Sequence, residues 1–211
     1  MGLLVKIYMD WMAFKFYRWL KEELLLRLII AISGASGSIY GIRLLEELKR
    51  KGIETHLLIS RWGRETILKE TSYDIEYIRS LASFNYNEDQ QGAIISSGSF
   101  PCNGMVVAPC SMKTLAGIAN GYAADLLIRA ADVTIKERRK LVLLTRETPL
   151  NAIHLENMLK LARIGVTIMP PVPAFYTKPL NIEDIVAHTV GRVLDQFGLE
   201  ADGIKRWKGI R

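Results

Sequence analysis

Cysteine is scarce in this chain, which has only Cys102 and Cys110 among its 211 residues. The two lie eight positions apart, without a second pair and without a Cys-x-x-Cys spacing, which argues against a disulfide framework and a zinc site. The three histidines, His56, His154 and His188, are far apart, and acidic residues form no cluster at metal-ligand spacing. The sequence therefore predicts a metal-independent protein of a reducing compartment, the cytoplasm.

An uninterrupted apolar run of membrane-spanning length is also missing. Residues 1–26 are rich in large apolar side chains, but frequent charges argue against a transmembrane helix, and no small-residue cleavage site marks a signal peptide. Apolar residues spaced four and three apart predict instead an amphipathic helix over 1–26, separate from a domain over 27–211. Packing on protein is favoured over a membrane surface because the polar face mixes both signs of charge. The interrupting charges are Lys6, Asp10, Lys15, Arg18 and Lys21.

The charge balance is only mildly basic. Lys and Arg number 28 against 22 Asp and Glu, which gives a net charge of +6 without a long Lys/Arg tract. This balance suits anionic ligands and gives no indication of nucleic-acid binding. A hydrophobic content of 49% over 211 residues is enough for one α/β domain with a sizeable core.

Apolar runs alternate with helical patterns along the chain. This alternation predicts an α/β fold with a doubly wound, mostly parallel sheet of the Rossmann or flavodoxin-like type, in one domain. Residues 72–92 are weakly patterned, and Asn85, Asn87, Glu88 and Asp89 indicate a loop within this segment. The predicted strands are the apolar run between Arg27 and Gly34 and the segments 53–60, 105–108, 141–144 and 166–169. The predicted helices lie near 42–48 and at 62–71, 111–120, 125–138, 153–162 and 182–197, with Ile67 and Leu68 of the second helix facing inward.

The first strand leads into a glycine turn with Gly34, Ser36 and Gly37, followed by a helix. Backbone N–H groups of such a turn and the positive helix end suit a phosphate. An ordinary strand-to-helix turn without a ligand remains the alternative, because glycines after a strand are common. The glycines do not form G-x-G-x-x-G, and the second strand ends in Ser60-Arg61 without an acidic residue, which favours a mononucleotide over NAD. Four segments are expected to meet at the ligand edge of the sheet: Gly34–Ser38, Ser60–Arg61, Pro109–Thr114 and Thr145–Glu147.

Six motifs together resemble the UbiX family of flavin prenyltransferases, from about Leu28 to Leu199. Members of that family join the dimethylallyl group of dimethylallyl phosphate to reduced FMN, and UbiD-type decarboxylases use the prenylated flavin. They form large homo-oligomers, typically dodecamers, with sites at subunit contacts. The motifs are Gly34–Gly37 (GASG), Ser96–Ser99 (SSGS), Ala108–Leu115 (APCSMKTL), Arg129–Arg139 (RAADVTIKERR), Arg146–Pro149 (RETP) and Met169–Tyr176 (MPPVPAFY).

The resemblance implies roles for individual residues. Glu70 and Glu147 would handle protons, with Ser36 near the reacting ring. Tyr176 and Arg192 would hold the donor phosphate, and Lys136 and Arg129 from a neighbouring subunit would add positive charge there. FMN would be held by Gly34, Ala35, Ser36, Ser60, Ser111, Met112, Lys113, Thr114 and Arg146.

These roles agree with the chemistry, because a phosphate leaving group departs readily only when cations and donors meet its charge. Buried carboxyl groups can supply or accept the protons that such a reaction moves. Plainer roles remain open for four of the residues. They are a salt bridge with Arg146 for Glu147, a surface ion pair with Asp132 for Lys136, a solvated helix end for Glu70 and simple packing for Tyr176.

Three other functions remain as alternatives. An FMN-dependent cysteine decarboxylase would share the fold, but its Pro-x-Met-Asn segment is absent from the corresponding region, Glu147–His154. A non-catalytic flavin carrier would keep the glycine turn without needing Lys136, Glu147, Tyr176 and Arg192. A membrane-surface adaptor would bind lipid through residues 1–26 even without FMN.

Overall fold

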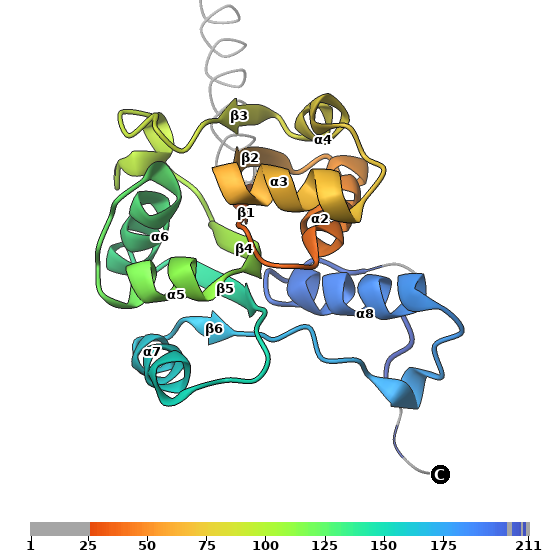
Figure 1. Cartoon of the computed structure of the whole chain (residues 1–211). Helices are drawn as coiled ribbons and strands as arrows, with labels where there is room; N and C mark the ends of the chain where they lie inside the picture. The colour runs from red at the N-terminus through yellow and green to blue at the C-terminus, as the bar shows by residue number, and fades with distance from the viewer. Residues whose placement is uncertain (1–25, 202–203, 208, 210–211) are drawn as a thin grey trace, which may run out of the picture.

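The computed structural model describes residues 26–201, 204–207 and 209, so the predicted amphipathic helix lies outside the described residues except for Leu26. Within the described part of the chain, six parallel strands form one sheet in the order β3-β2-β1-β4-β5-β6 (Figure 1). This arrangement confirms the predicted doubly wound α/β fold. The strands are β1 (Arg27–Ile32), β2 (Glu54–Ile59), β3 (Phe84–Tyr86), β4 (Gly104–Cys110), β5 (Lys140–Thr145) and β6 (Thr167–Ile168).

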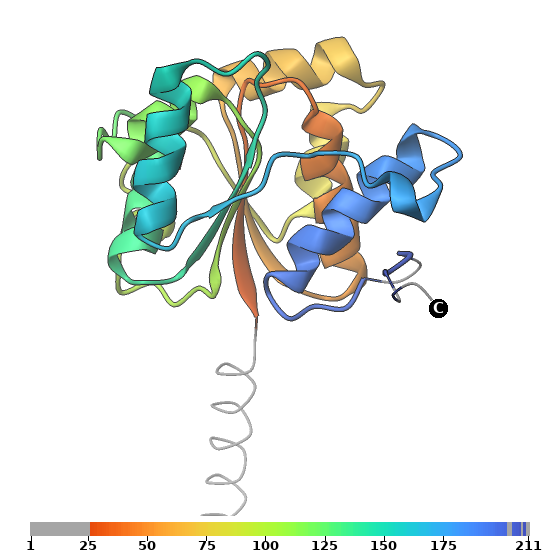
Figure 2. The same ribbon diagram turned by 90° about the horizontal axis from the view of Figure 1, so that it is seen from below.

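Helices cover both faces of the sheet (Figure 2). Helices α2, α3, α4 and α8 bury one face, and α5, α6 and α7 bury the other. None of these described helices is long and apolar enough to cross a membrane. The bounds are α2 (Ser38–Arg50), α3 (Arg61–Glu70), α4 (Ile75–Leu81), α5 (Met112–Ala119), α6 (Leu126–Lys136), α7 (Ala152–Arg163) and α8 (Ile182–Asp195), with short 3₁₀ turns η1 (Ile94–Ser96) and η2 (Phe175–Thr177).

The central strands owe their apolar character to these two helical layers. Along β1, Ile30 and Ile32 pack towards α2 and α8, whereas Ile29 and Ala31 pack towards α5 and α6. Because both sides of a parallel strand are covered, the alternation of polar and apolar residues disappears. This is why the strands can be recognised as continuous apolar runs.

Two details of the sequence prediction are wrong. The weakly patterned segment 72–92 contains α4, which Asp74 caps by accepting a hydrogen bond from Glu76 N, and the edge strand β3, so Asn85 lies in a strand and not in a loop. Phe84 of β3 is 49% exposed, so this strand lacks the apolar run that marks the inner strands. Leu68 was expected to point inward but is 57% exposed, because only Ile67 of that pair faces the core.

The strand order reverses between β1 and β4, and a buried serine joins the two strand ends there. Ser33, which is 1% exposed, donates its hydroxyl hydrogen to the Pro109 carbonyl oxygen at 2.8 Å. The same hydroxyl accepts from the Ser111 backbone N–H at 2.8 Å. One side chain therefore fixes the loops after β1 and β4 against each other, at the position where ligands of doubly wound sheets bind.

Replacement of Ser33 by alanine is expected to lower the free energy of unfolding by about 1–3 kcal/mol, because it leaves the Ser111 N–H without its acceptor. Urea unfolding at neutral pH measures this change. Ser80→Ala is the control, since the exposed Ser80 hydroxyl bonds only to Tyr77 O in its own helix. A Ser33→Ala variant as stable as the wild type would show that the hydroxyl does not hold the two loops together.

Candidate active site

A cavity of about 350 Å³ lies at the carboxyl ends of β1, β2 and β4. Five of the nine residues expected to hold the flavin line it, and small or hydroxyl-bearing side chains predominate among them. These five are Gly34, Ser60, Ser111, Lys113 and Thr114. Arg61, Trp62, Glu88, Asp125, Leu127 and Ile128 complete the lining.

The loop after β1 needs glycine at its first position. A Cβ atom at Gly34 would overlap the Cβ of Trp62, so a side chain there would push the loop away from the start of α3. Gly37 has φ +98°, a left-handed conformation that favours glycine. The glycine turn therefore allows a close approach of backbone to the cavity, as expected from the sequence.

The N-terminus of α5 points a partial positive charge at the same cavity. Ser111 caps this helix by accepting a hydrogen bond from Thr114 N at 3.3 Å, and its hydroxyl donates to Thr114 Oγ1 at 3.1 Å. Lys113 adds a full positive charge in the first turn. Helix dipole, hydroxyls and ammonium group together make this end of the cavity suitable for a phosphate.

The N-terminus of α2, in contrast, already carries a carboxylate. Glu70 Oε2 accepts from Gly37 N at 2.8 Å and from Ser38 N at 3.3 Å. The sequence makes this helix end a candidate phosphate site, and in the structure Glu70 accepts hydrogen bonds from its N–H groups. The N-terminus of α5 is capped by the Ser111 hydroxyl and not by a carboxylate. The open alternative of a purely solvated Glu70 does not hold, because its side chain binds the loop after β1.

The pKa of Glu70 reflects these contacts. Burial raises it, but hydrogen bonds from the Ser36 hydroxyl and from the Gly37 and Ser38 donors outweigh burial and hold it below its ordinary value of 4.5. Because the native pKa is lowered, these bonds stabilise the fold fully above about pH 4.5 and are lost as the pH falls through the native pKa.

Glu70→Gln is therefore expected to be less stable than the wild type at pH 7, with the difference vanishing in acid. Thermal unfolding across pH 7 to pH 3 would measure this convergence. Glu65→Gln, on the exposed side of the same helix, is the control that should match the wild type throughout. A Glu70→Gln deficit that persists unchanged in acid would contradict the ionic origin of the contact.

Arg146 and Glu147 follow β5 directly at the same edge of the sheet. Arg146 N donates to Cys110 O at 3.1 Å, which fixes this segment beside the end of β4. Glu147 is exposed, and its Oε1 accepts from Thr148 N at 3.0 Å. Within the described part of the chain, the structure records no ion pair between Glu147 and Arg146, so both side chains remain available at the sheet edge.

Ser36, Ala35 and Met112 also belong to this edge, although they do not line the cavity itself. Ala35 is 8% exposed, and Ser36 and Met112 are half-buried in the loops that follow β1 and β4. Burial raises the pKa of the nearby Cys110 thiol, so this cysteine stays protonated and is a packing residue, not a nucleophile.

Arg129 and Lys136 lie outside this cavity in the single chain. Helix α6 begins beside the cavity and ends just before β5 begins at Lys140, so Lys136 lies near the opposite edge of the sheet. Arg129 Nη1 pairs with Asp132 at 2.7 Å, and its Nε donates to Ser96 O at 3.3 Å. Lys136 pairs with Glu137, so the ion pair with Asp132 that the spacing allows is not formed.

Tyr176 and Arg192 form a third group, on η2 and α8. Tyr176 OH lies 3.1 Å from His188 Nε2, and Arg192 Nη1 pairs with Asp195 at 2.7 Å. Both side chains are exposed, and neither lines the cavity. One chain thus brings together the residues expected to hold the flavin but not those expected to hold the donor phosphate.

Several residues that line the cavity were not predicted from the sequence. Trp62 lines the cavity and is 62% exposed. Its position two residues after Ser60, at the end of a predicted strand, is the signal in the sequence that could have indicated this place. Asp125 caps α6 by accepting from Ile128 N at 2.9 Å. Glu88 accepts from Arg61 N at 3.0 Å, but it lies in the segment without a clear pattern. Among the described residues, no His, Cys, Asp and Glu side chains group as a metal site would require.

The sheet order, the reversal between β1 and β4 and the phosphate-suited cavity define a mononucleotide-binding α/β protein. Comparison with known proteins narrows this class. The sequence profile of the family described as Flavoprotein matches residues 19–194. A probable UbiX-like flavin prenyltransferase of Bacillus subtilis is 55% identical over 87% of this chain and 90% of its own length.

Solved structures agree. A structure described as AnUbiX (PadA1) in complex with FMN and dimethylallyl pyrophosphate is 49% identical, with a TM-score of 0.87 over 88% of this chain and 99% of that one. A dodecameric FMN-dependent UbiX-like decarboxylase from Escherichia coli O157:H7 is 54% identical, with a TM-score of 0.86 over 87% and 100%. The chain belongs to the flavoprotein family, among the UbiX-like flavin prenyltransferases, which confirms the resemblance seen in its motifs.

The cysteine decarboxylase alternative finds no comparable support. The structure of the FMN-dependent cysteine decarboxylase TvaF is only 17% identical, with a TM-score of 0.57, and so shares the fold alone. The chain is thus 55% identical to a probable flavin prenyltransferase but only 17% identical to a cysteine decarboxylase of the same fold.

Proposed function

We propose that this chain transfers the dimethylallyl group of dimethylallyl phosphate to reduced FMN. The observation that carries the proposal is the cavity between the ends of β1, β2 and β4, where the N-terminus of α5, Lys113 and the Ser60, Ser111 and Thr114 hydroxyls suit a flavin phosphate. A cavity of about 350 Å³ falls in the range of small-molecule sites and fits a mononucleotide. The names of similar proteins, a probable UbiX-like flavin prenyltransferase and a UbiX structure with FMN and dimethylallyl pyrophosphate, support the same reaction.

In this proposal, the flavin supplies the carbon or nitrogen atom that is alkylated, and the protein manages charge and protons. Breaking the C–O bond leaves a phosphate, whose charge Lys136, Arg146 and Arg192 would meet together with the Tyr176 hydroxyl. A guanidinium can grip two phosphate oxygens, whereas the lysine acts as a mobile point charge. Glu70 and Glu147 would move the proton released at the ring or taken up by the phosphate, with Ser36 near the reacting ring.

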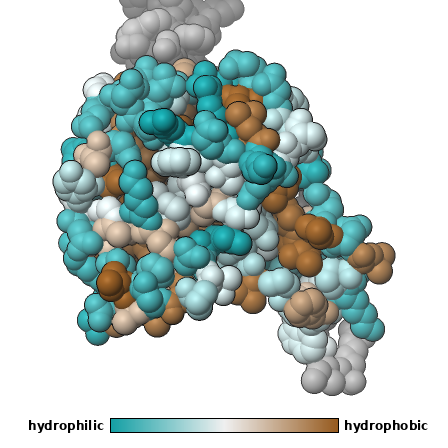
Figure 3. Space-filling view, viewed as in Figure 1, coloured by the Kyte–Doolittle hydropathy of each residue, from teal (hydrophilic) through white to brown (hydrophobic). Residues whose placement is uncertain are grey.

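We further propose a homo-oligomer, as large as a dodecamer, in which neighbouring copies supply the donor-phosphate groups. Two observations support it: the three groups of site residues are separate in one chain, and a 54% identical relative is dodecameric. Exposed apolar side chains provide surface for such contacts. They include Ile153, Leu155 and Leu159 on α7 and Leu180 and Ile182 before and at the start of α8, where brown atoms gather at the right of Figure 3.

The remaining parts of the proposal concern the cellular setting. The prenylated flavin would pass to a UbiD-type decarboxylase, and the donor is a dimethylallyl ester of phosphate or of diphosphate, the latter being bound by a 49% identical relative. A reducing compartment, the cytoplasm, is supported by the free thiols of Cys102 and Cys110.

Anaerobic incubation with reduced FMN and dimethylallyl phosphate, followed by mass spectrometry of the flavin, tests the proposal. A flavin heavier by one prenyl unit supports it. Tight FMN binding with unchanged flavin mass would favour the carrier, and parallel reactions with the diphosphate ester compare the two donors. Lipid binding through residues 1–26 without FMN would favour the membrane adaptor.

A further inference from the structure

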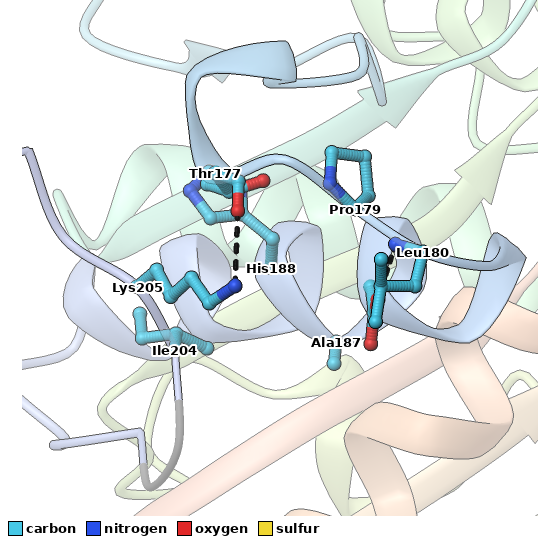
Figure 4. Close-up of a pocket in the computed structure, with 8 residues that line it drawn as sticks. Thr177, Pro179, Leu180, Ala187, His188, Ile204 and Lys205 are labelled. Carbon is cyan, nitrogen blue, oxygen red and sulfur yellow. Dashed lines mark hydrogen bonds between the residues drawn. The ribbon is translucent and has the colours of Figure 1, made fainter.

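The segment that follows α8 folds back over the residues expected to hold the donor phosphate. Ile204 packs on Gly191, where an added Cβ would lie 2.8 Å from the Ile204 side chain. Lys205 Nζ donates to Thr177 O at 3.2 Å, as the dashed line in Figure 4 shows. A cavity of about 190 Å³ remains between this segment, η2 and α8. The close fit at glycine shows that residues 204–207 have a defined seat on α8.

This segment contacts Tyr176 directly. The Trp207 ring meets the Tyr176 ring edge to face, with 5.6 Å between centroids and an angle of 81°. The His188 ring meets the same tyrosine at 5.8 Å and 85°, and its Nε2 lies 3.1 Å from the Tyr176 hydroxyl. Two aromatic neighbours therefore restrict the tyrosine ring, and its hydroxyl stays on an exposed surface.

The same segment shares a carboxylate with Arg192. Asp195 accepts from Arg192 Nη1 at 2.7 Å and also from Arg206, at 2.9 Å from Nη1 and 2.7 Å from Nη2. Both oxygens of Asp195 are thus bound by one planar guanidinium in a fork geometry, while Arg192 contacts a single oxygen. The Arg206 guanidinium is also the main reason why the pKa of Asp195 lies below its usual range.

This arrangement has a consequence for charge. Asp195 alone would cancel the charge of Arg192 and compete with an incoming phosphate for its N–H groups. Arg206 satisfies the carboxylate, so the trio carries a net positive charge and Arg192 keeps donors free. The geometry points to Arg206 as a positioning residue for the donor phosphate, which acts by occupying Asp195; this inference rests on the proposed function.

The test compares Arg206→Gln with the double variant Asp195→Asn/Arg206→Gln in the full-length enzyme. The single change is expected to raise KM for dimethylallyl phosphate by about fivefold, with the Kd for FMN unchanged, because Asp195 then holds Arg192 more fully. The double change is expected to restore KM to the wild-type value, since the competing carboxylate is gone. Arg163→Gln, at an exposed arginine at the end of α7, is the matched control.

A merely structural role for Arg206 predicts a different pattern, in which the double variant is no better than the single one. That outcome, or an unchanged KM in Arg206→Gln, would overturn the inference while wild-type turnover keeps the proposed function intact. Binding of inorganic phosphate, measured by ³¹P line broadening, gives a readout without turnover. Phosphate binding should weaken in Arg206→Gln and recover in the double variant. Equal broadening in the wild type, the single variant and the double variant would overturn the inference even if the wild type made no product.

Discussion

Glu147→Gln is expected to bind FMN like the wild type and to lower kcat by about 10²–10⁴, the usual contribution of a general acid or base. Glutamine keeps the size of the side chain and removes only its ability to exchange a proton. The residues that line the flavin cavity come from the loops after β1, β2, β3 and β4 and from α3, α5 and α6, so the change leaves them untouched. Glu147 itself follows β5, with its carboxylate exposed at the sheet edge.

Flavin fluorescence titration and mass spectrometry of the product measure the two parts of this result. Glu156→Gln provides the control, because Glu156 is an exposed carboxylate on the neighbouring helix α7 and has no place in the site. Equal loss of FMN binding and of turnover would indicate a folding defect. Product formation at the wild-type rate would remove Glu147 from the mechanism.

Lys136→Ala is expected to lower kcat/KM for dimethylallyl phosphate by about 10²–10³, as removal of one preorganised donor to a developing anion does elsewhere. In the isolated chain Lys136 pairs with Glu137, near the opposite edge of the sheet from the flavin cavity. A large effect on transfer would therefore require that the lysine acts on the cavity of another copy.

Co-expression of Lys136→Ala with Glu147→Gln tests whether Lys136 acts on the cavity of another copy. If each site takes Glu147 from one chain and Lys136 from its neighbour, random mixing leaves about a quarter of the sites with both residues, and about that fraction of wild-type activity returns. Each variant alone supplies the inactive baseline. Mixed assemblies as inactive as the two parents would place both residues in the site of a single chain.

The parts of the fold that depend on residues close together in the sequence could be predicted from it. The inner strands are continuous apolar runs, and Ser111 occupies the capping position that its place before a helix suggests. Strand β3 could not be predicted, because its side chains are largely exposed and only its pairing with β2 defines it as a strand. The loop of the first glycine turn was recognised, but no local pattern reveals that Glu70, 33 residues away, binds Gly37 N.

The site divides in the same way. Ser60, Ser111 and Thr114 follow strands that end at one edge of the sheet, so their meeting could be inferred from topology. Trp62 and Glu88 join them through the packing of α3 and of the loop after β3, which the sequence does not encode locally. The distant groups on α6, η2 and α8 are linked to the site only by resemblance, because no contact within the described part of the chain joins them to the flavin cavity.

A structure of the assembled protein with FMN and dimethylallyl phosphate bound together tests the account most directly. The account predicts the flavin phosphate at the N-terminus of α5, beside Ser60 and Thr114. It also predicts Lys136, Tyr176 and Arg192 of adjoining copies within hydrogen-bonding distance of the donor phosphate. A flavin seated elsewhere, or these three side chains remote from the donor in every copy, would contradict it.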